Sequence, residues 1–517
     1  MPAEKFEKVA LLLRSDDDVA VLKRPVKAGL ELDCGTASIV LRRDIPAGHK
    51  VAVRDLREGQ PIRKYGQAIG FARGEIRAGD HVHEHNVFVK DFERDYAFCK
   101  EAHPVNFYPA DRMRSFQGYA RADGRVGTRN YVAVISSVNC SASVSKYVVE
   151  QFRNVDLKGE FPNIDGVVAF THKSGCAMQV TEPHKLLQRV LAGMARHPNI
   201  GGYVLIGLGC EVNQVQFLVR DQKLDQSSAH GPAPAVMTIQ NLGGIRKTVE
   251  AAVAAVRRIL PEANSIQRTR QPVSKLILAE NCGGSDGNSG ITANPALGVA
   301  SDELVRYGGT SVLAETTEIY GAEHLLTRRA ATREVGEKLV ELIHWWENHV
   351  RAQNAVINNN PSFGNKEGGL TTIYEKSLGA VAKGGQSPLA AVYQYAEQIN
   401  TPGFCFMDTP GFDPVSMTGL VAGGCNIGVF TTGRGSVYGC KPAPCIKVAT
   451  NTPLFNWMNE DMDINAGTIL DGTETVEQVG LRIFEKIIAV ASGEKTKSEL
   501  AGMGDEEFAP WMLGPTF

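Results

Sequence analysis

The stretch YVAVISSVNCSASVSKYVVEQF, residues 131–152, joins an apolar strand to a helix and decides the fold class. Residues 131–135 are continuously apolar, which is typical of a strand covered on both faces, and residues 144–152 have helical spacing. The same alternation returns twice, at 166–170 with 184–197 and at 203–207 with 246–260. This pattern predicts an α/β domain with a mostly parallel sheet over residues 116–270.

A second α/β domain is expected over residues 271–517. Its strands are expected at 276–278, 311–313, 403–406 and 428–430, and its helices at 329–350 and 474–492. Residues 1–95 instead show short apolar alternations broken by Gly and Pro, which predicts a small β domain. The polar stretch 96–115 has no clear period and is expected to be a linker. The Gly/Asn-rich stretch 354–370 is expected to be a functional loop, as long loops in compact domains often are.

The composition excludes several classes of protein. A chain of 517 residues, of which 43% are hydrophobic, is expected to form two or three domains, because one core rarely exceeds about 300 residues. The net charge of -2, without a run of Lys or Arg, argues against a nucleic-acid partner. No apolar run reaches about 18 residues and the N-terminus does not resemble a signal peptide, so we expect no membrane span and a cytoplasmic location.

Four cysteines each follow an apolar strand. They are Cys140, Cys176, Cys210 and Cys282. Ligands bind beyond the carboxyl ends of strands in open α/β sheets, so we expect these thiols to converge and at least two to bind metal. Thiolate is a soft ligand suited to iron or zinc, as a single ion or in a cluster. The alternative is that each thiol is a small buried side chain that packs beneath a helix, as free Cys often is.

Three histidines fall close together in HVHEHN, residues 81–86. On a strand, alternate side chains share one face, and imidazole is the commonest metal ligand, so His83 and His85 are candidate ligands. The alternative is a solvated polar face without a role. His49, in a turn, and His172, at a strand end, are candidate bases or ligands, or histidines whose hydrogen bonds are merely structural.

Charged residues in Gly-rich loops form a further set of candidates. Asp286 lies in CGGSDGNSG, where the phosphate-binding patterns GxGxxG and GxxxxGK[ST] are absent, so a polyol-binding loop with a catalytic carboxylate is expected. Glu315 and Glu318 could bind metal or simply begin a helix. Lys366 and Arg434 suit the carboxylate of an anionic substrate, and the alternative is that both are ordinary surface charges.

Several phrases of the sequence together resemble the altronate/galactarate dehydratase family. They are GYARADGRVGTRN (118–130), HKSGC (172–176), VLIGLGCE (204–211), CGGSDGNSGITANP (282–295), PSFGNKEGG (361–369), FTTGRG (430–435) and DINAGT (463–468). In the N-terminal region GHK, KYG and HVHEHN resemble the family's small β-clip domain of the SAF type. The fold class is therefore a small N-terminal SAF-like β-clip domain followed by two α/β units with mostly parallel sheets. One departure is Phe363, which stands where the family usually has Pro.

The resemblance implies that a sugar acid is dehydrated to a 2-keto-3-deoxy acid with iron as Fe²⁺, or with Mn²⁺ or an iron–sulfur cluster. Such a reaction needs a base for the proton beside the carboxylate, an acid for the leaving hydroxyl and a Lewis acid for the enediolate. His49, His172, Lys366 and Asp286 are the candidate catalytic residues. The candidate substrate-binding residues are Arg129, Asn130, Ser285, Asn365, Lys366 and Arg434. A small sugar acid is the expected partner, and the resemblance favours a homo-oligomer.

Two other functions stay open at the level of sequence. The HVHEHN phrase and YGAEHLL (320–326) look more like the altronate branch, but a sulfo-lyase that acts on sulfolactate carries a similar histidine cluster. β-Elimination from another hydroxy acid is therefore the alternative enzyme reading. A binding protein without turnover would need a degenerate site, whereas every motif is intact except at Phe363.

Overall fold

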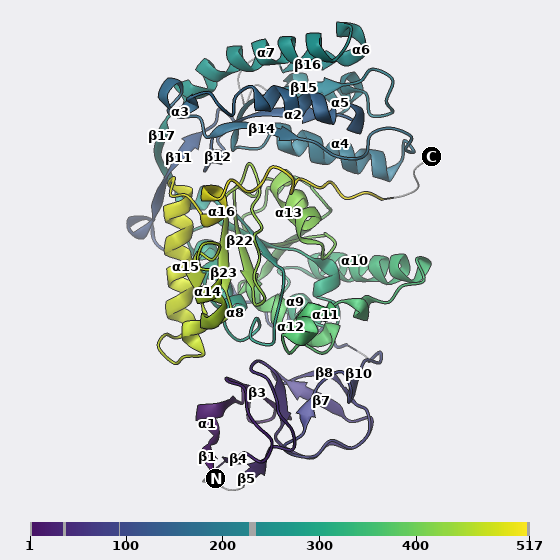
Figure 1. Ribbon diagram of the computed structural model, residues 1–517, viewed down its shortest axis with the longest axis vertical. Helices are drawn as coiled ribbons and strands as arrows, with labels where there is room; N and C mark the ends of the chain where they lie inside the picture. Colours follow the sequence, from purple (N-terminus) through teal and green to yellow (C-terminus); the bar gives the residue numbers. More distant parts are fainter. Residues whose placement is uncertain (1–2, 35–37, 93, 227–233, 514–517) are drawn as a thin grey trace.

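Three regions stack along the long axis of the computed structural model, which describes residues 3–34, 38–92, 94–226 and 234–513 (Figure 1). The N-terminal β domain lies at one end, the last region of the sequence lies in the middle, and the second region lies at the other end. Residues 1–2, 35–37 and 93 of the expected β domain and residues 514–517 of the expected second α/β domain lie outside the described residues. The expected fold class, a β domain and two mostly parallel α/β units, is confirmed.

The β domain consists of short strands in three small sheets. The sheet orders are β2-β3-β6-β9, β10-β8-β7 and β1-β4-β5. The strands are β1 Glu4–Lys5, β2 Ala10–Leu11, β3 Val19–Leu22, β4 Glu31–Asp33, β5 Ser38–Val40, β6 Lys50–Ala52, β7 Pro61–Lys64, β8 Gln67–Ala72, β9 His81–Val82 and β10 Val87–Phe88, with one short helix, α1 Phe6–Val9. Part of this domain shares a hydrophobic core with the middle region, where Ile62 and Ile69 join a cluster with Leu378 and Phe404. The β domain is therefore packed onto its neighbour rather than hanging from a linker.

The second region is a four-stranded parallel sheet of order β14-β13-β15-β16. Its strands are β13 Tyr131–Ser136, β14 Gly166–Phe170, β15 Ile200–Gly207 and β16 Ala235–Thr238. Helices α2 Ala142–Glu150 and α7 Ile245–Ser265 cover one face, and α4 Glu182–Ala195 and α5 Val215–Asp221 cover the other. Each helix packs an apolar stripe against the strands. Strands β13, β14 and β15 and helices α2, α4 and α7 match the predicted alternation, whereas β16 and α5 were not predicted.

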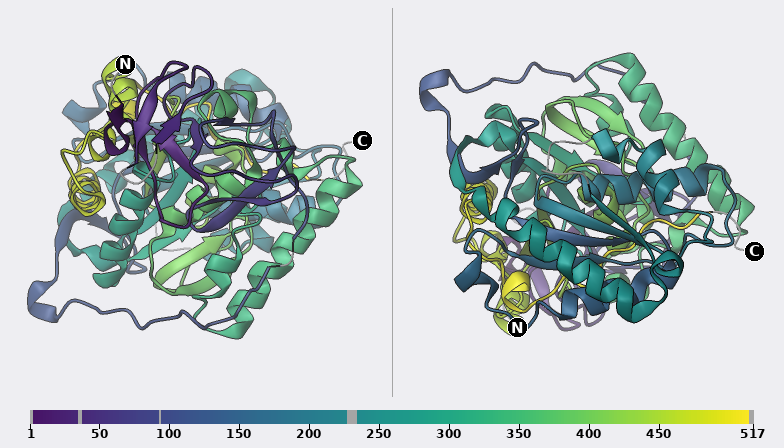
Figure 2. Two further views of the ribbon diagram at one scale, coloured as in Figure 1. Left: turned by 90° about the horizontal axis from the view of Figure 1, so that it is seen from below. Right: turned by 90° about the horizontal axis from the view of Figure 1, so that it is seen from above.

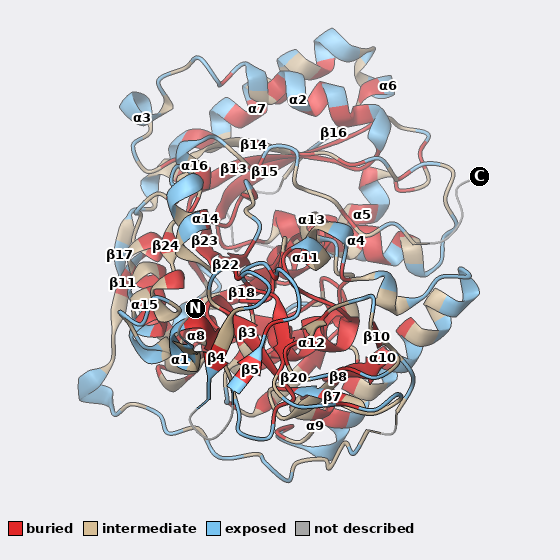
Figure 3. Cartoon of the chain, turned by 60° about the horizontal axis from the view of Figure 1, so that its bottom comes forward, coloured by how far each residue is buried: buried red, intermediate tan, exposed pale blue. Residues whose placement is uncertain are grey.

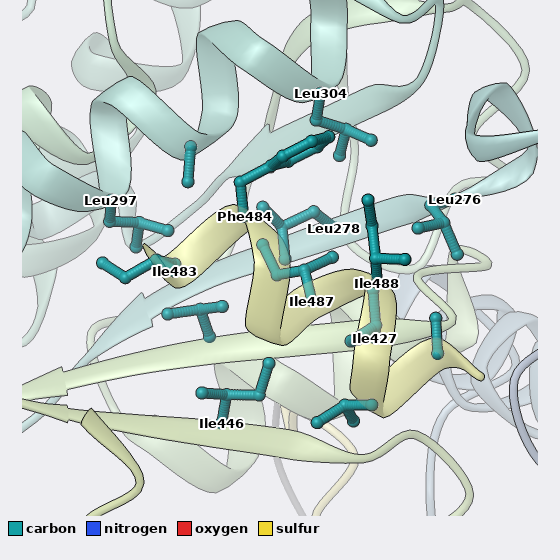
Figure 4. Packing of buried hydrophobic residues seen from close by; sticks show 14 of the residues in the cluster. Leu276, Leu278, Leu297, Leu304, Ile427, Ile446, Ile483, Phe484, Ile487 and Ile488 are labelled. Carbon is teal, nitrogen blue, oxygen red and sulfur yellow. The ribbon is translucent and has the colours of Figure 1, made fainter. Parts of the chain in front are cut away.

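The middle region is a seven-stranded parallel sheet of order β20-β21-β19-β18-β22-β23-β24. Its strands are β18 Ile277–Cys282, β19 Thr310–Leu313, β20 Leu389–Tyr393, β21 Gly403–Met407, β22 Ile427–Thr432, β23 Cys445–Ala449 and β24 Ile464–Asn465. On one face α8 Ala293–Arg306 and α15 Val476–Ala491 pack together, and Figure 4 shows Ile483, Phe484 and Ile487 of α15 between α8 and the strands. Helix α13 Asp413–Ala422 covers the other face. Buried residues therefore gather on both sides of the sheets, as Figure 3 shows.

The remaining elements connect and cover these sheets. They are β11 Ser115–Ala120, β12 Val126–Gly127, β17 Arg268–Pro272, α3 Leu157–Glu160, α6 Ile239–Leu242, α9 His324–Thr327, α10 Arg333–Ala352, α11 Phe363–Glu367, α12 Ile373–Val381, α14 Thr452–Trp457 and α16 Lys497–Leu500. The expected linker is largely irregular and runs along the outside of the middle region, where the Tyr108 N–H donates to the Arg306 carbonyl (Figure 2). The stretch 354–370 is not all loop, because a capping box formed by Ser362 and Asn365 starts the short helix α11. Among the described residues no helix is both long and apolar enough to cross a membrane.

Candidate active site

The seven-stranded sheet reverses its strand order at β18, whose neighbours β19 and β22 lead to opposite halves of the sheet. Such a switch point leaves a crevice beside the carboxyl ends of the strands, where ligands bind in open α/β folds. The segments that leave β18, β19 and β22 here carry Asp286, Glu315 and Arg434. Glu315 has a φ of 68°, a left-handed conformation that is uncommon outside Gly and is concentrated at functional sites. The fold thus brings three of the predicted charged residues to one edge.

A turn of the β domain closes this crevice by fitting between two Gly-rich loops. A Cβ atom on Gly287 or on Gly369 would collide with the carbonyl oxygen of Gly48, so both positions need glycine for the backbones to approach this closely. The Gly287 N–H donates to the Gly368 carbonyl at 2.8 Å and joins the two loops to each other. The glycines that the sequence clusters in CGGSDG and NKEGG therefore let the β domain dock.

A buried ion triad fastens the same contact. Glu375 of α12 lies between two lysines of the β domain, with Lys50 Nζ 2.8 Å from one carboxylate oxygen and Lys64 Nζ 2.9 Å from the other. All three side chains are fully buried. Burial alone would raise the pKa of Glu375, but Lys50 and Lys64 hold that pKa well below its ordinary value. The sequence showed no sign of this triad, because its members are buried only by the docking of the two domains.

Three histidines of the β domain meet beside the second of these loops. His49 Nδ1 lies 3.0 Å from His81 Nε2, and one ligand atom from each of His49, His81 and His83 lies within 4.8 Å of the others. His49 Nε2 lies 3.0 Å from the Glu367 carbonyl oxygen. His83 Nδ1 is buried without a hydrogen-bond partner among the described residues. A buried ring nitrogen without a partner is costly, and in this trio the nitrogen is placed to act as a metal ligand.

The electrostatics of this imidazole trio favour neutral rings. Burial, together with repulsion from His49 and His83, lowers the pKa of His81 to about 2. Burial and the nearby Lys50 lower the pKa of His83 to about 4. Neutral imidazole is the form that binds a metal ion, so the trio could hold one.

The trio differs from the histidine pair expected from the sequence. Strand β9 ends at Val82, and the following residues form a turn in which the Asn86 N–H donates to the His83 carbonyl. The rings therefore cluster because of a turn and not because of strand alternation. His85 is exposed and lies 3.4 Å from Arg43, outside the trio, whereas His49 joins it from a distant turn.

A hollow of about 750 Å³ lies beside the Gly-rich loops, lined by Asp286, Asn288, Gly368, Arg434 and Asn451 among others. The buried Asp286 carboxylate accepts hydrogen bonds from Ser289, Asn288, Thr450 and Asn451. Burial raises the pKa of Asp286 against the effect of these donors. The polar groups of Asp286, Asn288, Arg434 and Asn451 in this lining are of the kind that bind hydroxyl and carboxylate groups.

The two predicted carboxylate-binding cations line different hollows. Arg434 Nη2 lies 3.3 Å from Glu367 Oε2 at the smaller hollow. Lys366 Nζ lies 3.1 Å from Glu84 Oε2 at a larger groove of about 1030 Å³, which His85 also lines. Each cation is paired with a glutamate side chain that is roughly half exposed. A bound anion would have to displace those glutamates or share the cations with them.

A second group of possible ligands is completely buried behind the crevice. Cys282 Sγ lies 3.5 Å from Glu315 Oε2 and 3.6 Å from Glu318 Oε2, and this group could also hold a metal ion. Lys383 Nζ lies 2.7 Å from Glu315 and 3.0 Å from Cys282, and Lys376 Nζ lies 2.7 Å from Glu318. Burial raises the pKa of the Cys282 thiol. The group thus already contains its own cations.

Several other predicted site residues are engaged in structural contacts. The donors of Arg129 are taken by Glu499 and by backbone carbonyls, including that of Val490. Asn130 bonds backbone carbonyls at Asn163 and Ala263. Arg129 thus joins the four-stranded region to the C-terminal segments, and Asn130 bonds within the four-stranded region. The structure does not bring either residue to the crevice.

Two further predicted residues have side chains that bond the backbone. His172 Nε2 lies 3.0 Å from the Ser136 carbonyl, and Nδ1 accepts from the Ser174 N–H, so both ring nitrogens are used. Burial lowers the pKa of His172 to about 4. The Asn365 amide donates to the Ser285 carbonyl and ties α11 to the Asp286 loop. These contacts hold loops in place, and the structure groups Cys282 with Glu315 and Glu318 instead of with Cys140, Cys176 and Cys210.

Comparison with known proteins agrees with this architecture. Three family models match along the chain: "Altronate/galactarate dehydratase SAF domain" over residues 8–90, "D-galactarate dehydratase/Altronate hydrolase, second domain" over 118–264, and "D-galactarate/Altronate dehydratase, C-terminal" over 273–516. Galactarate dehydratase (L-threo-forming) of Escherichia coli (strain K12) is 39% identical over 485 residues, 93% of this chain and 92% of that protein. Altronate dehydratase of Bacillus subtilis (strain 168) is 34% identical over 487 residues, 94% of this chain and 96% of that protein.

A more distant relative is divided into two subunits. The (2R)-sulfolactate sulfo-lyase subunit beta of Chromohalobacter salexigens is 31% identical over 399 residues, 76% of this chain and 96% of that subunit. Its subunit alpha is 46% identical over 55 residues, 11% of this chain and 58% of that subunit. The long, full-length matches are to the two dehydratases, and the chain belongs to the altronate/galactarate dehydratase family.

Proposed function

We propose that this enzyme is a hydro-lyase that removes water from a sugar acid of the altronate or galactarate type and releases a 2-keto-3-deoxy acid. The observation that carries the proposal is the imidazole trio, which lies where the β domain meets the crevice of the seven-stranded sheet. Its His83 Nδ1 is buried and has no hydrogen-bond partner among the described residues. The dehydratases among the relatives support the same reaction class. We assign the reaction to the crevice between these two regions.

The chemistry of the trio suits a divalent metal. His49, His81 and His83 would hold the ion as neutral ligands, and we propose Fe²⁺, with Mn²⁺ as the alternative. When bound, such an ion supplies a Lewis acid that stabilises negative charge on the enediolate form of the substrate. The trio would leave coordination positions open, as catalytic metal sites do.

Residues around the smaller hollow supply the remaining functions. Arg434 would orient the substrate carboxylate, because a guanidinium can bind both carboxylate oxygens at once. Asp286 would take the proton from the carbon next to that carboxylate, since a buried carboxyl with a raised pKa is suited to proton transfer. Asn288 and Asn451 would bind substrate hydroxyls. The β-domain turn over the crevice would exclude water from the reacting carbons.

A substrate panel tests this proposal directly. The anaerobically purified protein is given Fe²⁺ and then altronate, galactarate or sulfolactate, and formation of a 2-keto acid is followed with semicarbazide. We expect a 2-keto acid from one of the two sugar acids and loss of that activity after chelation. Release of sulfite from sulfolactate, without turnover of either sugar acid, would favour the sulfo-lyase alternative that the two-subunit relative suggests.

A further inference from the structure

Three thiols lie at the carboxyl edge of the four-stranded sheet, far along the molecule from the β domain (Figure 1). Cys140 follows β13, Cys176 follows β14 and Cys210 follows β15, and these three strands are direct neighbours. All three residues are exposed, whereas Cys282, Cys405, Cys425 and Cys445 are buried. Free Cys is among the most buried residue types, so three exposed thiols on one sheet edge are not explained by packing.

The loops that carry these thiols are hydrogen-bonded to one another. The Asn139 N–H donates to the Ser174 carbonyl at 2.9 Å, which joins the Cys140 loop to the Cys176 loop. The Asn213 N–H donates to the Gly175 carbonyl at 3.0 Å, which joins the Cys176 loop to the Cys210 loop. The Asn213 side-chain amide donates to the Ser137 carbonyl at 2.9 Å and completes the circle. Each thiol thus lies within three residues of a bond to another thiol's loop.

Buried polar side chains fix this arrangement from below. His172 links the Ser136 carbonyl to the Ser174 N–H and holds the start of the Cys176 loop. Glu211 accepts from the Ser137 hydroxyl at 2.8 Å and from the Gly209 N–H. It therefore fixes the backbone next to Cys210 and links it to the end of β13. A Cβ atom on Gly175 would lie 2.5 Å from the Ser137 carbonyl oxygen, which shows how closely the loops approach. Such support is what a preorganised ligand set requires.

We propose that Cys140, Cys176 and Cys210 together hold an iron–sulfur cluster. Thiolates are the protein ligands that such clusters use, and an inorganic cluster spans sulfurs that lie too far apart for one ion. Among the described residues, the groups whose ligand atoms lie within 4.8 Å of one another do not include these three sulfurs, so a single ion would not contact all three in this arrangement. Three thiolates leave one iron of a four-iron cluster without a cysteine ligand. The assignment does not depend on the proposed dehydratase activity.

Metal and sulfide analysis of the full-length, anaerobically purified protein tests the cluster. We expect iron and acid-labile sulfide together, with the visible absorption of a cluster and, after one-electron reduction with dithionite, an electron paramagnetic resonance signal. Cys140→Ser, Cys176→Ser and Cys210→Ser should each lower the sulfide content by at least about tenfold. The matched control is Cys34→Ser, an exposed thiol of the β domain, and it should keep the wild-type content. Wild-type protein without sulfide, or with zinc in place of iron, would overturn the proposal.

Thiol alkylation of the wild-type chain gives a second test that needs no variant to fold. In the anaerobic protein Cys34 should react while Cys140, Cys176 and Cys210 are protected, as peptide mass spectrometry would show. After the cluster is destroyed with a chelator and an oxidant, followed by reduction, all four should react. Equal labelling of the four thiols before that treatment would contradict a bound cluster.

Discussion

Two groups in this enzyme place three possible ligand atoms within 4.8 Å, and they differ in charge. The imidazole trio of His49, His81 and His83 is neutral, and its buried His83 Nδ1 has no hydrogen-bond partner in the part of the chain that the structure describes. The group of Cys282, Glu315 and Glu318 already has Lys376 and Lys383 as counter-ions. A metal ion can join the first group without expelling a cation, whereas in the second it would have to expel a buried ammonium. Proximity of ligand atoms is therefore a weaker sign of a metal site than unsatisfied bonding capacity.

The sharpest test of the comparison removes one imidazole. His83→Ala should lower kcat/KM by about a thousandfold and reduce bound metal, because three neutral ligands are needed to hold the ion. His85→Ala is the matched control, since that ring is exposed and outside the trio, and it should stay within about threefold of wild type. Steady-state rates with saturating Fe²⁺ and metal content per chain are the measurements. Equal loss in the two variants would remove the trio from the site.

The second prediction addresses the group that contains its own cations. Lys383→Met should destabilise the protein by about 3–5 kcal/mol, because Glu315 would keep a buried charge without its partner. Lys247→Met, at an exposed position on α7, should change the free energy of unfolding by less than about 0.5 kcal/mol. Denaturant unfolding of the metal-free chains measures both. If Lys383→Met instead gained a tightly bound metal ion and kept its stability, the Lys383 ammonium would occupy the place of a metal ion in this group.

Substituting one arginine in each hollow tests which of the two hollows binds the substrate carboxylate. Arg434→Ala should raise KM for the sugar acid by about 10–100-fold, the loss expected for a charged hydrogen bond of about 1.5–3 kcal/mol. Arg351→Ala, in the larger groove, should leave KM unchanged. Substrate titration of both variants decides the matter. A raised KM in Arg351→Ala alone would move the substrate carboxylate to the larger groove.

The smallest expected effect concerns a buried carboxyl that forms no ion pair with any of the described residues. Glu280 on β18 is buried, and burial raises its pKa to about 7 from 4.5, against the Ser311 hydroxyl that bonds it. Between those two pH values the native chain holds more protons than the unfolded chain, so stability should fall as pH rises through that range. The slope has an upper limit of about 1.4 kcal/mol per pH unit.

Glu280→Gln should flatten that dependence. The free energy of unfolding of the variant minus that of wild type should therefore be larger at pH 8 than at pH 5. Unfolding curves at the two pH values for both chains give the difference directly. Glu58→Gln, an exposed residue of the β domain, is the control and should leave the wild-type slope unchanged. An unchanged slope in Glu280→Gln would mean that Glu280 titrates near its ordinary pKa.

Local patterns predicted much of the fold because the apolar spacing that marks a strand or a helix can be recognised within a short segment. The segment 131–152 became β13 and α2, and the Cys-bearing loops follow strands as expected. The sequence indicated only part of the imidazole trio. HVHEHN stood out as a cluster, but His49 lies far from it in the sequence and joins it through the pairing of β6 with β9. Lys50 and Glu375 gave no signal, because burial of a charge depends on how domains dock. Arg129 looked like a ligand for an anion, but its partner Glu499 lies near the other end of the chain.

The lysine–glutamate triad has a consequence for how this chain is assembled. Because Lys50, Lys64 and Glu375, with the shared apolar core, hold the β domain in place, the connecting segment acts mainly as a tether. A tether contributes by raising the effective concentration of one domain near the other. Cut there, the enzyme would become a heterodimer whose activity depends on dilution, with the crevice complete only while the two pieces are bound. The (2R)-sulfolactate sulfo-lyase also has separate alpha and beta subunits, each of which is similar to part of this chain.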